Sequence, residues 1–182
     1  MQSPPCLTCL PDPLEVRLRS GTPVAVRALV PEDRDLVAGA FERLSERSRL
    51  MRFLSPVPRL PRRMLDALVD VDHDRHVALV ALDGGAAIGV ARYVRDTADP
   101  SVADFAISVV DAYQGRGLGR ALTGALLDVA ATRGVRTFVM DIHPDNEAML
   151  SLARSLGARP AFADGAVRAE VTVASRRHVA AA

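Results

Sequence analysis

Apolar and polar residues alternate with a period of two over several stretches of the chain. Residues 14–19 and 22–29 alternate on either side of a Ser-Gly turn, which predicts an N-terminal hairpin. The runs 75–82 and 86–95 flank Asp-Gly-Gly, a strong hairpin signal. Residues 102–109 alternate again, and we expect them to form the central strand. These strands together predict the antiparallel half of a sheet.

In four other segments, apolar residues recur at the spacing of a helix face. The first opens at Pro31, which favours the first turn of a helix, and a shorter one opens at Pro61. The longest begins at Leu118 and ends at Gly134, a residue typical of the position after a helix. Asp145 is expected to cap the last helix, which ends at Gly157.

The remaining segments complete a mixed α/β pattern. Residues 45–60 carry arginines among apolar residues and are interpreted as a connection between helices. Residues 135–141 are rich in strand formers and must return beside the central strand through a crossover. Two short strands, 160–163 and 167–173, finish the sheet. Helices are therefore expected on both faces of one mixed sheet.

Composition narrows the possible functions. The chain has 182 residues, 49% of them hydrophobic, which suits a single domain over 14–182 after a proline-rich leader, 1–13. The net charge is only +1, so nothing in the overall charge predicts binding to nucleic acid or to an anionic membrane. The aromatic content is 4% with no tryptophan, which argues against stacking surfaces for single-stranded nucleic acid. There is no lysine, which excludes a Schiff-base enzyme. Without a targeting segment or a membrane span, a cytoplasmic protein is expected.

Metal binding is not expected. Cys6 and Cys9 form a single C-x-x-C, which supplies only half of a zinc site, and we interpret them as incidental to the leader. His73 and His76 have ligand-like spacing, but two extended residues three apart point to opposite faces of a strand.

A glycine-rich turn carries the clearest chemistry. Gln114-Gly-Arg-Gly-Leu-Gly119 follows the central strand and opens the longest helix. Glycines let the backbone approach a ligand, and a helix N-terminus attracts anions, above all phosphate. The dinucleotide fingerprint fails because Arg120 stands where its third glycine belongs, and the Gly-Lys-Ser/Thr loop needs a lysine.

Gln-x-x-Gly-x-Gly between a strand and a helix resembles the acetyl-CoA loop of the GNAT superfamily of N-acetyltransferases. The resemblance spans about 24–173 and implies the acyl-CoA N-acyltransferase fold, with about seven strands splayed at the middle of the sheet and the N-terminal hairpin as an extension. Within the superfamily, the sequence is most similar to the catalytic domain of bacterial Pat-type protein lysine acetyltransferases. That similarity rests on Ser48 to Phe53, Val71-Asp-His73, Val94-Arg-Asp96, Ala103 to Ala106 and Asp111 to Gly117.

The resemblance implies how acetyl-CoA is held. Backbone N–H groups of the loop opened by Gln114 would bind the pyrophosphate, with contributions from Gly115, Arg116, Gly117, Leu118, Gly119 and Arg120. Ile107, Ser108 and Val109 would pair with the pantetheine arm as an added strand, and the N–H of Val109 would stabilise the oxyanion. Asn146 matches an asparagine that contacts the coenzyme A moiety.

Asp104 is the candidate general base, because a lysine ammonium with an ordinary pKa of about 10.4 must lose its proton in the site. The matching position in Pat-type enzymes is a glutamate, so the shorter aspartate would work through a water. The alternative is a strand-edge carboxylate paired with an arginine. A general acid is not expected, because Ala153 stands where many GNAT enzymes carry a tyrosine.

The sequence does not decide which class of molecule accepts the acetyl group. The leading hypothesis is transfer of acetyl from acetyl-CoA to a protein lysine. The alternatives are a small amine, such as a polyamine, an amino acid or an aminoglycoside, and a non-catalytic acetyl-CoA sensor. Arg47, Arg49 and Arg52 either read an acidic acceptor or form a solvated face.

Overall fold

The computed structural model describes residues 13–163 and 165–173. The expected leader, 1–13, with Cys6 and Cys9, lies outside the described residues except for Pro13. The elements in chain order are β1 (Leu14–Arg17), β2 (Pro23–Ala28), η1 (Pro31–Asp33), α1 (Arg34–Glu42), α2 (Glu46–Phe53), α3 (Arg62–Val69), β3 (His76–Asp83), β4 (Ala86–Arg95), β5 (Val102–Val109), η2 (Asp111–Tyr113), α4 (Leu118–Thr132), β6 (Thr137–Ile142), α5 (Glu147–Ser155), β7 (Ala161–Ala163) and β8 (Ala166–Thr172).

The described strands form one mixed sheet in the order β1-β2-β3-β4-β5-β6-β8-β7. Neighbouring strands are antiparallel except for β5 and β6, which are parallel because α4 crosses between them. Both predicted hairpins are confirmed. The sheet has eight strands in the described residues, against the seven or so that were expected.

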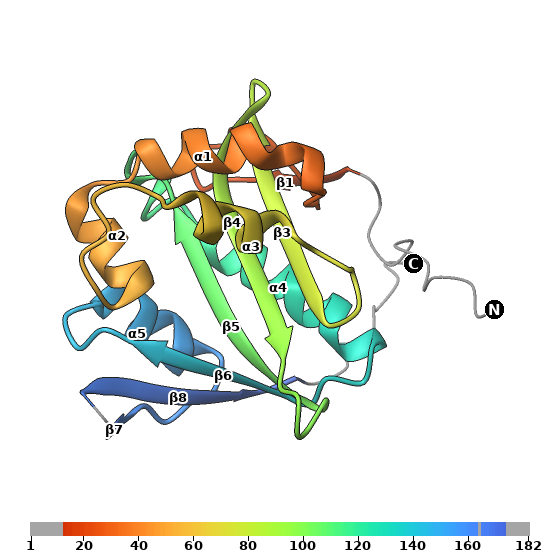
Figure 1. Cartoon of the computed structure of the whole chain (residues 1–182), viewed down its shortest axis with the longest axis vertical. Coiled ribbons are helices and arrows are strands. Elements are labelled where there is room, and N and C mark those ends of the chain that lie inside the picture. Colours follow the sequence, from red (N-terminus) through yellow and green to blue (C-terminus); the bar gives the residue numbers. More distant parts are fainter. Residues whose placement is uncertain (1–12, 164, 174–182) are drawn as a thin grey trace.

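Helices cover both faces of the sheet (Figure 1). Helices α1 and α3 pack on one face, over a core that includes Val37, Leu65 and Val80. Helix α4 and part of α5 cover the other face, where Leu122, Leu126 and Phe138 are fully buried. No helix in the described ranges combines the length and the apolar character that a bilayer crossing requires.

The parallel pair β5–β6 separates halfway along its length. Their pairing begins at Val102 opposite Thr137 and ends at Asp104 opposite Val139. On its other side, β5 stays paired with β4 as far as Val109 opposite Gly89. The second half of β5 therefore has one unpaired edge, and the expected splay at the middle of the sheet is confirmed.

Strand β4 carries an irregularity beside this splay. Its register with β3 shifts between Ala81 and Leu82, which leaves Ile88 as an extra residue. Next to it, a Cβ on Gly89 would lie 3.1 Å from Leu122 Cδ1 and 3.3 Å from Leu118 Cδ2. A side chain at this position would press on both leucines and on the Ser108 carbonyl, so glycine favours the close packing of the first turns of α4 on the sheet.

Two local expectations were wrong. Residues 46–53 form a helix, α2, whose N-cap Ser45 accepts a hydrogen bond from the Ser48 N–H at 3.2 Å. The cap of α5 is Asn146 instead of Asp145, because Asn146 is the non-helical residue whose side chain reaches the N–H of Met149.

Candidate active site

The glycine-rich turn leads directly from β5 into α4. Gly115 and Gly117 have φ of +70° and +91°, values that side-chain-bearing residues rarely adopt. Gly117 is the residue before the first turn of α4, and that helix has 15 residues. The free N–H groups of its first turn therefore point out of the turn, with the positive end of the helix dipole behind them.

A groove of about 520 Å³ runs from this turn along the open half of β5 to α5. Most of the residues predicted to bind the cofactor line it: Ile107, Ser108, Val109, Gln114, Gly115, Gly117, Gly119, Arg120 and Asn146. Two do not. The Leu118 side chain is fully buried in the core, and the Arg116 guanidinium lies over the Tyr113 ring, 5.5 Å from its centroid. For Leu118 only the backbone remains as a candidate contact.

Strand alternation sets which backbone groups face the groove. The N–H of Val110 donates to the carbonyl of Ile88 on β4 at 2.9 Å. Successive residues of a strand point their N–H groups to opposite sides. The N–H and C=O of Val109 therefore face the gap, where Gln114 Nε2 donates to that carbonyl at 2.9 Å. The oxyanion role assigned to the Val109 N–H stays a prediction, and its orientation suits that role.

A polar cluster that the sequence did not reveal ties α2 to the turn. The carboxylate of Asp111 accepts hydrogen bonds from Ser45 N at 3.0 Å, Ser45 Oγ at 2.6 Å and Ser48 Oγ at 2.9 Å. Gln114 Nε2 donates to Ser48 Oγ at 3.1 Å. The partners are more than 60 residues apart in the chain, so spacing alone carries no signal for this cluster.

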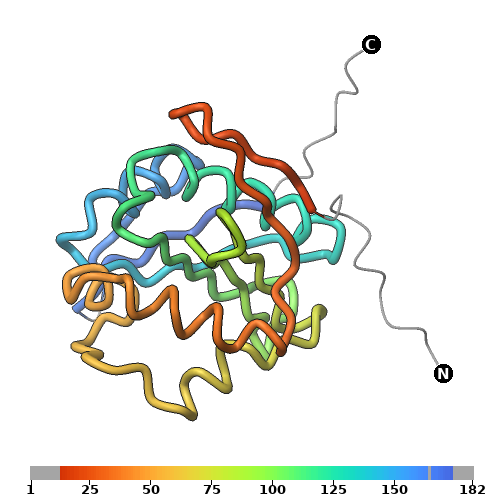
Figure 2. The backbone as a smooth tube through the Cα atoms, turned by 90° about the horizontal axis from the view of Figure 1, so that it is seen from above, coloured from red at the N-terminus to blue at the C-terminus, as the bar shows by residue number. Residues whose placement is uncertain are grey.

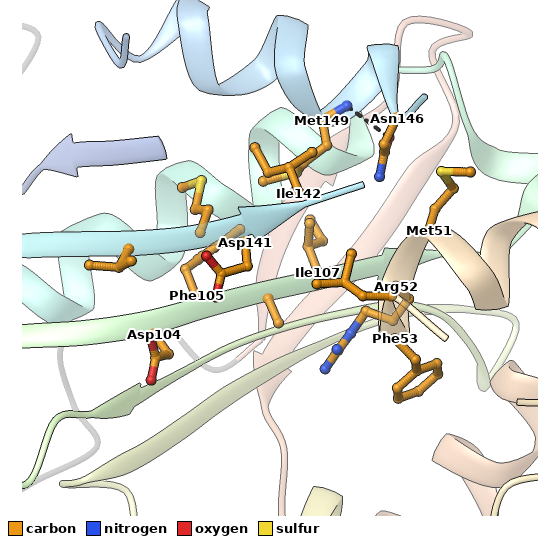
Figure 3. A pocket seen from close by; sticks show the side chains of 14 residues that line it. Met51, Arg52, Phe53, Asp104, Phe105, Ile107, Asp141, Ile142, Asn146 and Met149 are labelled. Atoms are coloured by element: carbon orange, nitrogen blue, oxygen red, sulfur yellow. Dashed lines mark hydrogen bonds between the residues drawn. The ribbon is translucent and has the colours of Figure 1, made fainter. Parts of the chain in front are cut away.

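The ends of the groove are fixed by two further contacts. The N–H of Arg19 donates to the carbonyl of Arg116 at 2.9 Å, which places the β1–β2 turn beside the start of α4 (Figure 2). At the other end, Arg47 Nη2 donates to the carbonyl of Asp145 at 3.3 Å and joins α2 to the loop before α5. The Asn146 Oδ1 is used by Met149 N, and its amide nitrogen points toward the gap between α5 and β5 (Figure 3).

A second cavity, of about 350 Å³, adjoins the groove at the splay (Figure 3). Asp104 of β5 and Asp141 of β6 line it. Burial raises the pKa of Asp104 above its ordinary value, and the nearby carboxylate of Asp141 raises it further, against an opposing attraction from Arg168. No arginine in the described part of the chain lies within ion-pair distance of Asp104, so the alternative of a carboxylate paired with an arginine has only the attraction of Arg168 in its favour.

The three arginines of α2 have different surroundings. Arg49 is a structural residue: it donates to the carbonyl of Pro58 at 2.6 Å and lies over the Phe41 ring, 4.3 Å from its centroid. Arg47 holds the loop before α5, as described above. Arg52 lines both the groove and the second cavity. The sequence could not separate these roles, because all three arginines share one helix.

No group of three or more metal-ligating side chains occurs among residues 13–163 and 165–173. His73 has a positive φ of 58° and is not extended, so the two-face argument does not apply to it. His76 Nδ1 contacts the carbonyl of Asp70 at 2.8 Å and its Nε2 contacts Arg92 at 3.1 Å. Its ring nitrogens are therefore engaged within the protein.

The acetyltransferase (GNAT) family matches residues 41–158, which include the splay, the glycine-rich turn and all of α5. The chain belongs to this family. It is an acyltransferase with the GNAT fold, and the expected fold is confirmed. The crystal structure of the GNAT domain of PAT from S. lividans superimposes with a TM-score of 0.83, at 32% identity over 88% of this chain and 96% of that one.

Two curated acetyltransferases are similar in sequence. Acetyltransferase Pat of Mycolicibacterium smegmatis is 35% identical over 88% of this chain and 49% of its own length, so the chain spans about half of that relative. Acetyltransferase PA5475 of Pseudomonas aeruginosa is 34% identical over 77% of each chain. The resemblance to Pat-type GNAT domains is confirmed.

In this GNAT domain, the position where a tyrosine acid was sought is a buried alanine, Ala153. Tyr113 lines the groove, but its hydroxyl donates to Asp83 Oδ2 at 2.7 Å. Within the described residues, neither of these positions offers a free acid beside the splay.

Proposed function

We propose that this acetyltransferase transfers the acetyl group of acetyl-CoA to the side-chain amine of a lysine in a protein. The observation that carries the proposal is the meeting of two cavities at the splay of β5 and β6. One leads to the glycine-rich turn at the N-terminus of α4, and the other is lined by two carboxylates. The similarity to acetyltransferases named Pat supports acetyl transfer, and the resemblance of the sequence to Pat-type protein lysine acetyltransferases favours a protein acceptor.

The residues divide the work of the reaction. Main-chain N–H groups from Gly115 to Arg120 bind the diphosphate of acetyl-CoA, and the open edge of β5 from Ile107 to Val109 pairs with the pantetheine arm. The thioester carbonyl then lies at the splay, where the N–H of Val109 donates to its oxygen as charge develops. Losing one such donor typically costs about 10²–10³ in rate.

The acceptor enters through the second cavity. Asp104 takes a proton from the ammonium, through a water, and the neutral amine attacks the thioester carbon. The C–N bond forms as the C–S bond breaks, the nitrogen gives up its remaining extra proton to water, and the thiolate of coenzyme A leaves. Because an ordinary thiol has a pKa near 8.5, solvent water protonates it without a side-chain acid. The raised pKa of Asp104 makes it a better base than an ordinary aspartate.

The test is release of free thiol from acetyl-CoA with a panel of acceptors, with the products identified by mass spectrometry. The panel holds lysine-containing proteins and peptides, polyamines, amino acids and aminoglycosides. The chain itself contains no lysine, so acetyl-lysine signals come from the acceptor alone. Acetylation of peptide lysines at the highest kcat/KM supports the proposal. Turnover of small amines only would assign the enzyme to that class, and binding of acetyl-CoA without any thiol release would make it a sensor.

A further inference from the structure

Arg52 has no partner for its charge among the described residues. It forms no ion pair and no hydrogen bond there, and its guanidinium lies only against the Phe53 ring, 4.8 Å from the centroid. Other partly buried arginines of the chain have carboxylate partners: Arg49 pairs with Glu42 and Arg95 with Asp74. Arg52 is half-buried, and partial loss of water around a guanidinium that has no anionic partner costs free energy, which an anionic ligand in the adjoining cavity would offset.

A more deeply buried guanidinium lies behind it. Arg92 of β4 is 6% exposed and donates to the carbonyl of Leu68 at 2.6 Å, with His76 Nε2 at 3.1 Å. Neither partner is an anion, since the neutral imidazole accepts through its ring nitrogen. Burial lowers the pKa of Arg92 to about 9, and repulsion by Arg52 adds to that effect. Both guanidinium groups thus remain charged near neutral pH.

The two arginines share an enclosed space that contains no acid. A small cavity of about 30 Å³ between the sheet and helices α1 to α3 is lined by both Arg52 and Arg92, and by no aspartate or glutamate. A cavity of this volume can hold about two water molecules or one small polar group. Positive charge is therefore concentrated at one place, with space beside it.

This positive site lies on the same face of the sheet as the acidic pair. Asp104 is paired with Val94, and Ala106 with Arg92, so the side chains of Asp104 and Arg92 are diagonal neighbours on one face. Arg52 extends from α2 across that face and lines the same 350 Å³ cavity as Asp104 and Asp141 (Figure 3). The cavity consequently presents carboxylates at one end and a guanidinium at the other.

A ligand that complements this cavity carries an amine and a carboxylate close together. We propose that Arg52 binds a carboxylate of the acceptor, next to the amine that is acetylated, with Arg92 as the second positive charge behind it. This inference rests on the proposed function. The carboxylate comes either from an acidic side chain flanking the acceptor lysine or from the α-carboxylate of a free amino acid. Both present the same planar anion to the guanidinium.

The test compares acceptors that differ only in the carboxylate. One pair is a peptide with glutamates flanking the lysine and the same peptide with glutamines; the other is free lysine and lysinamide. We expect kcat/KM to be about 10- to 100-fold higher for the acid member of at least one pair, because hydrogen bonds to charged groups contribute about 1.5–3 kcal/mol. The pair that shows the preference identifies the source of the carboxylate.

Arg52→Gln should reduce this preference to about one, and Arg52→Lys should keep part of it, since a lysine retains the charge but not the planar fork. Arg63→Gln removes an exposed charge from α3 and should leave the preference unchanged. A purely structural role for Arg52 would lower the rates of both members of a pair equally. The ratio separates that case from recognition.

Two results would overturn the inference. One is wild-type kcat/KM that is equal within each pair. The other is a preference that survives Arg52→Gln; if the affinity of that variant for acetyl-CoA, measured by calorimetry, also falls tenfold, Arg52 is assigned to the cofactor. In both cases acetyl transfer continues and the proposed function stands. If no amine is acetylated at all, the proposed function itself has failed.

Discussion

The carboxyl of Asp104 lies at the splay because β5 stops pairing with β6 at this residue. Its position is set by strand register, and its basicity by burial and by Asp141. Arg52 and Arg92 are set on the same face by α2 and by the register of β4. The chemistry proposed for the acceptor cavity therefore rests on a few charged side chains, and each can be changed singly.

Asp104→Asn should lower kcat/KM for an amine acceptor by about 10²–10⁴ at neutral pH, because an amide cannot accept the proton. Binding of acetyl-CoA should change little, since Asp104 does not line the groove that leads to the glycine-rich turn. Steady-state kinetics and calorimetry measure the two effects. Asp35→Asn, an exposed change on α1, is the matched control. Unchanged turnover of the Asp104 variant would remove Asp104 from the mechanism.

Asp141→Asn tests the source of the raised pKa of Asp104. A general base works when ionised, so kcat/KM falls as the pH drops through its pKa. Removing the negative charge of Asp141 lowers the pKa of Asp104 and should move this acidic limb to lower pH. The pH profile of kcat/KM for wild type and variant shows the shift. A limb that stays in place would mean that burial alone sets the pKa, or that another group titrates.

At the scale of elements, α2 closes one side of the groove and is held by polar contacts at its N-terminal end. Burial alone would raise the pKa of Asp111, but hydrogen bonds from Ser45 and Ser48 outweigh it and lower the pKa. The carboxylate is thus ionised at neutral pH and joins α2 to the turn that precedes α4. The expected position of the pyrophosphate lies directly beside this junction.

Asp111→Ala should raise the KM for acetyl-CoA by about two- to tenfold, because it removes the hydrogen bonds from Ser45 and Ser48 that order α2 over the groove. Asp35→Ala is the control for loss of an exposed carboxylate. The effect should appear in KM and in calorimetric affinity more than in kcat. A fall in kcat alone, at unchanged affinity, would contradict a role in shaping the groove.

The elements themselves were largely readable from the sequence. The hairpins, the central strand and α4 follow from periodicity and from turn residues such as Asp83-Gly84-Gly85. Helix α2 was missed because its arginines interrupt the apolar stripe, and it has no fully buried residue. The cap of α5 was misplaced by one residue, since Asp145 and Asn146 are equally good caps by type and only the structure shows that the Asn146 side chain accepts from the N–H of Met149.

For the whole molecule, two hydrophobic cores on opposite faces of the sheet fix the layers. A partly buried ion pair joins the N-terminal hairpin to the first helices. Asp33 is 5% exposed and accepts from both terminal nitrogens of Arg27, at 2.6 and 2.7 Å, and from Val30 N at 3.0 Å. Hydrogen bonds from Arg27 lower the pKa of Asp33 against the opposing effect of burial.

Asp33→Asn should destabilise the fold by about 2–4 kcal/mol at pH 7, because it removes the buried negative charge that pairs with Arg27 and accepts from the N–H of Val30. The melting temperature should fall by about 5–10 °C. The folded-state pKa is lowered, so this stability is present above the unfolded value of about 3.9 and is lost as pH falls through the folded value. The difference between wild type and variant should therefore shrink below about pH 4. A difference that persists there, or equal loss in Asp35→Asn, would contradict the ion-pair explanation.

The sequence by itself determined the order of the elements, the glycine-rich turn and the family, because these depend on residues that are neighbours in the chain. Main-chain contacts to a ligand are encoded by glycines, which can be recognised without a structure. Only the tertiary structure decided which polar and charged side chains lie close together. The members of each pair are distant in sequence: Asp104 and Asp141, Arg52 and Arg92, Asp111 and Ser45. Their roles follow from strand register, burial and helix packing, which no local sequence pattern predicts.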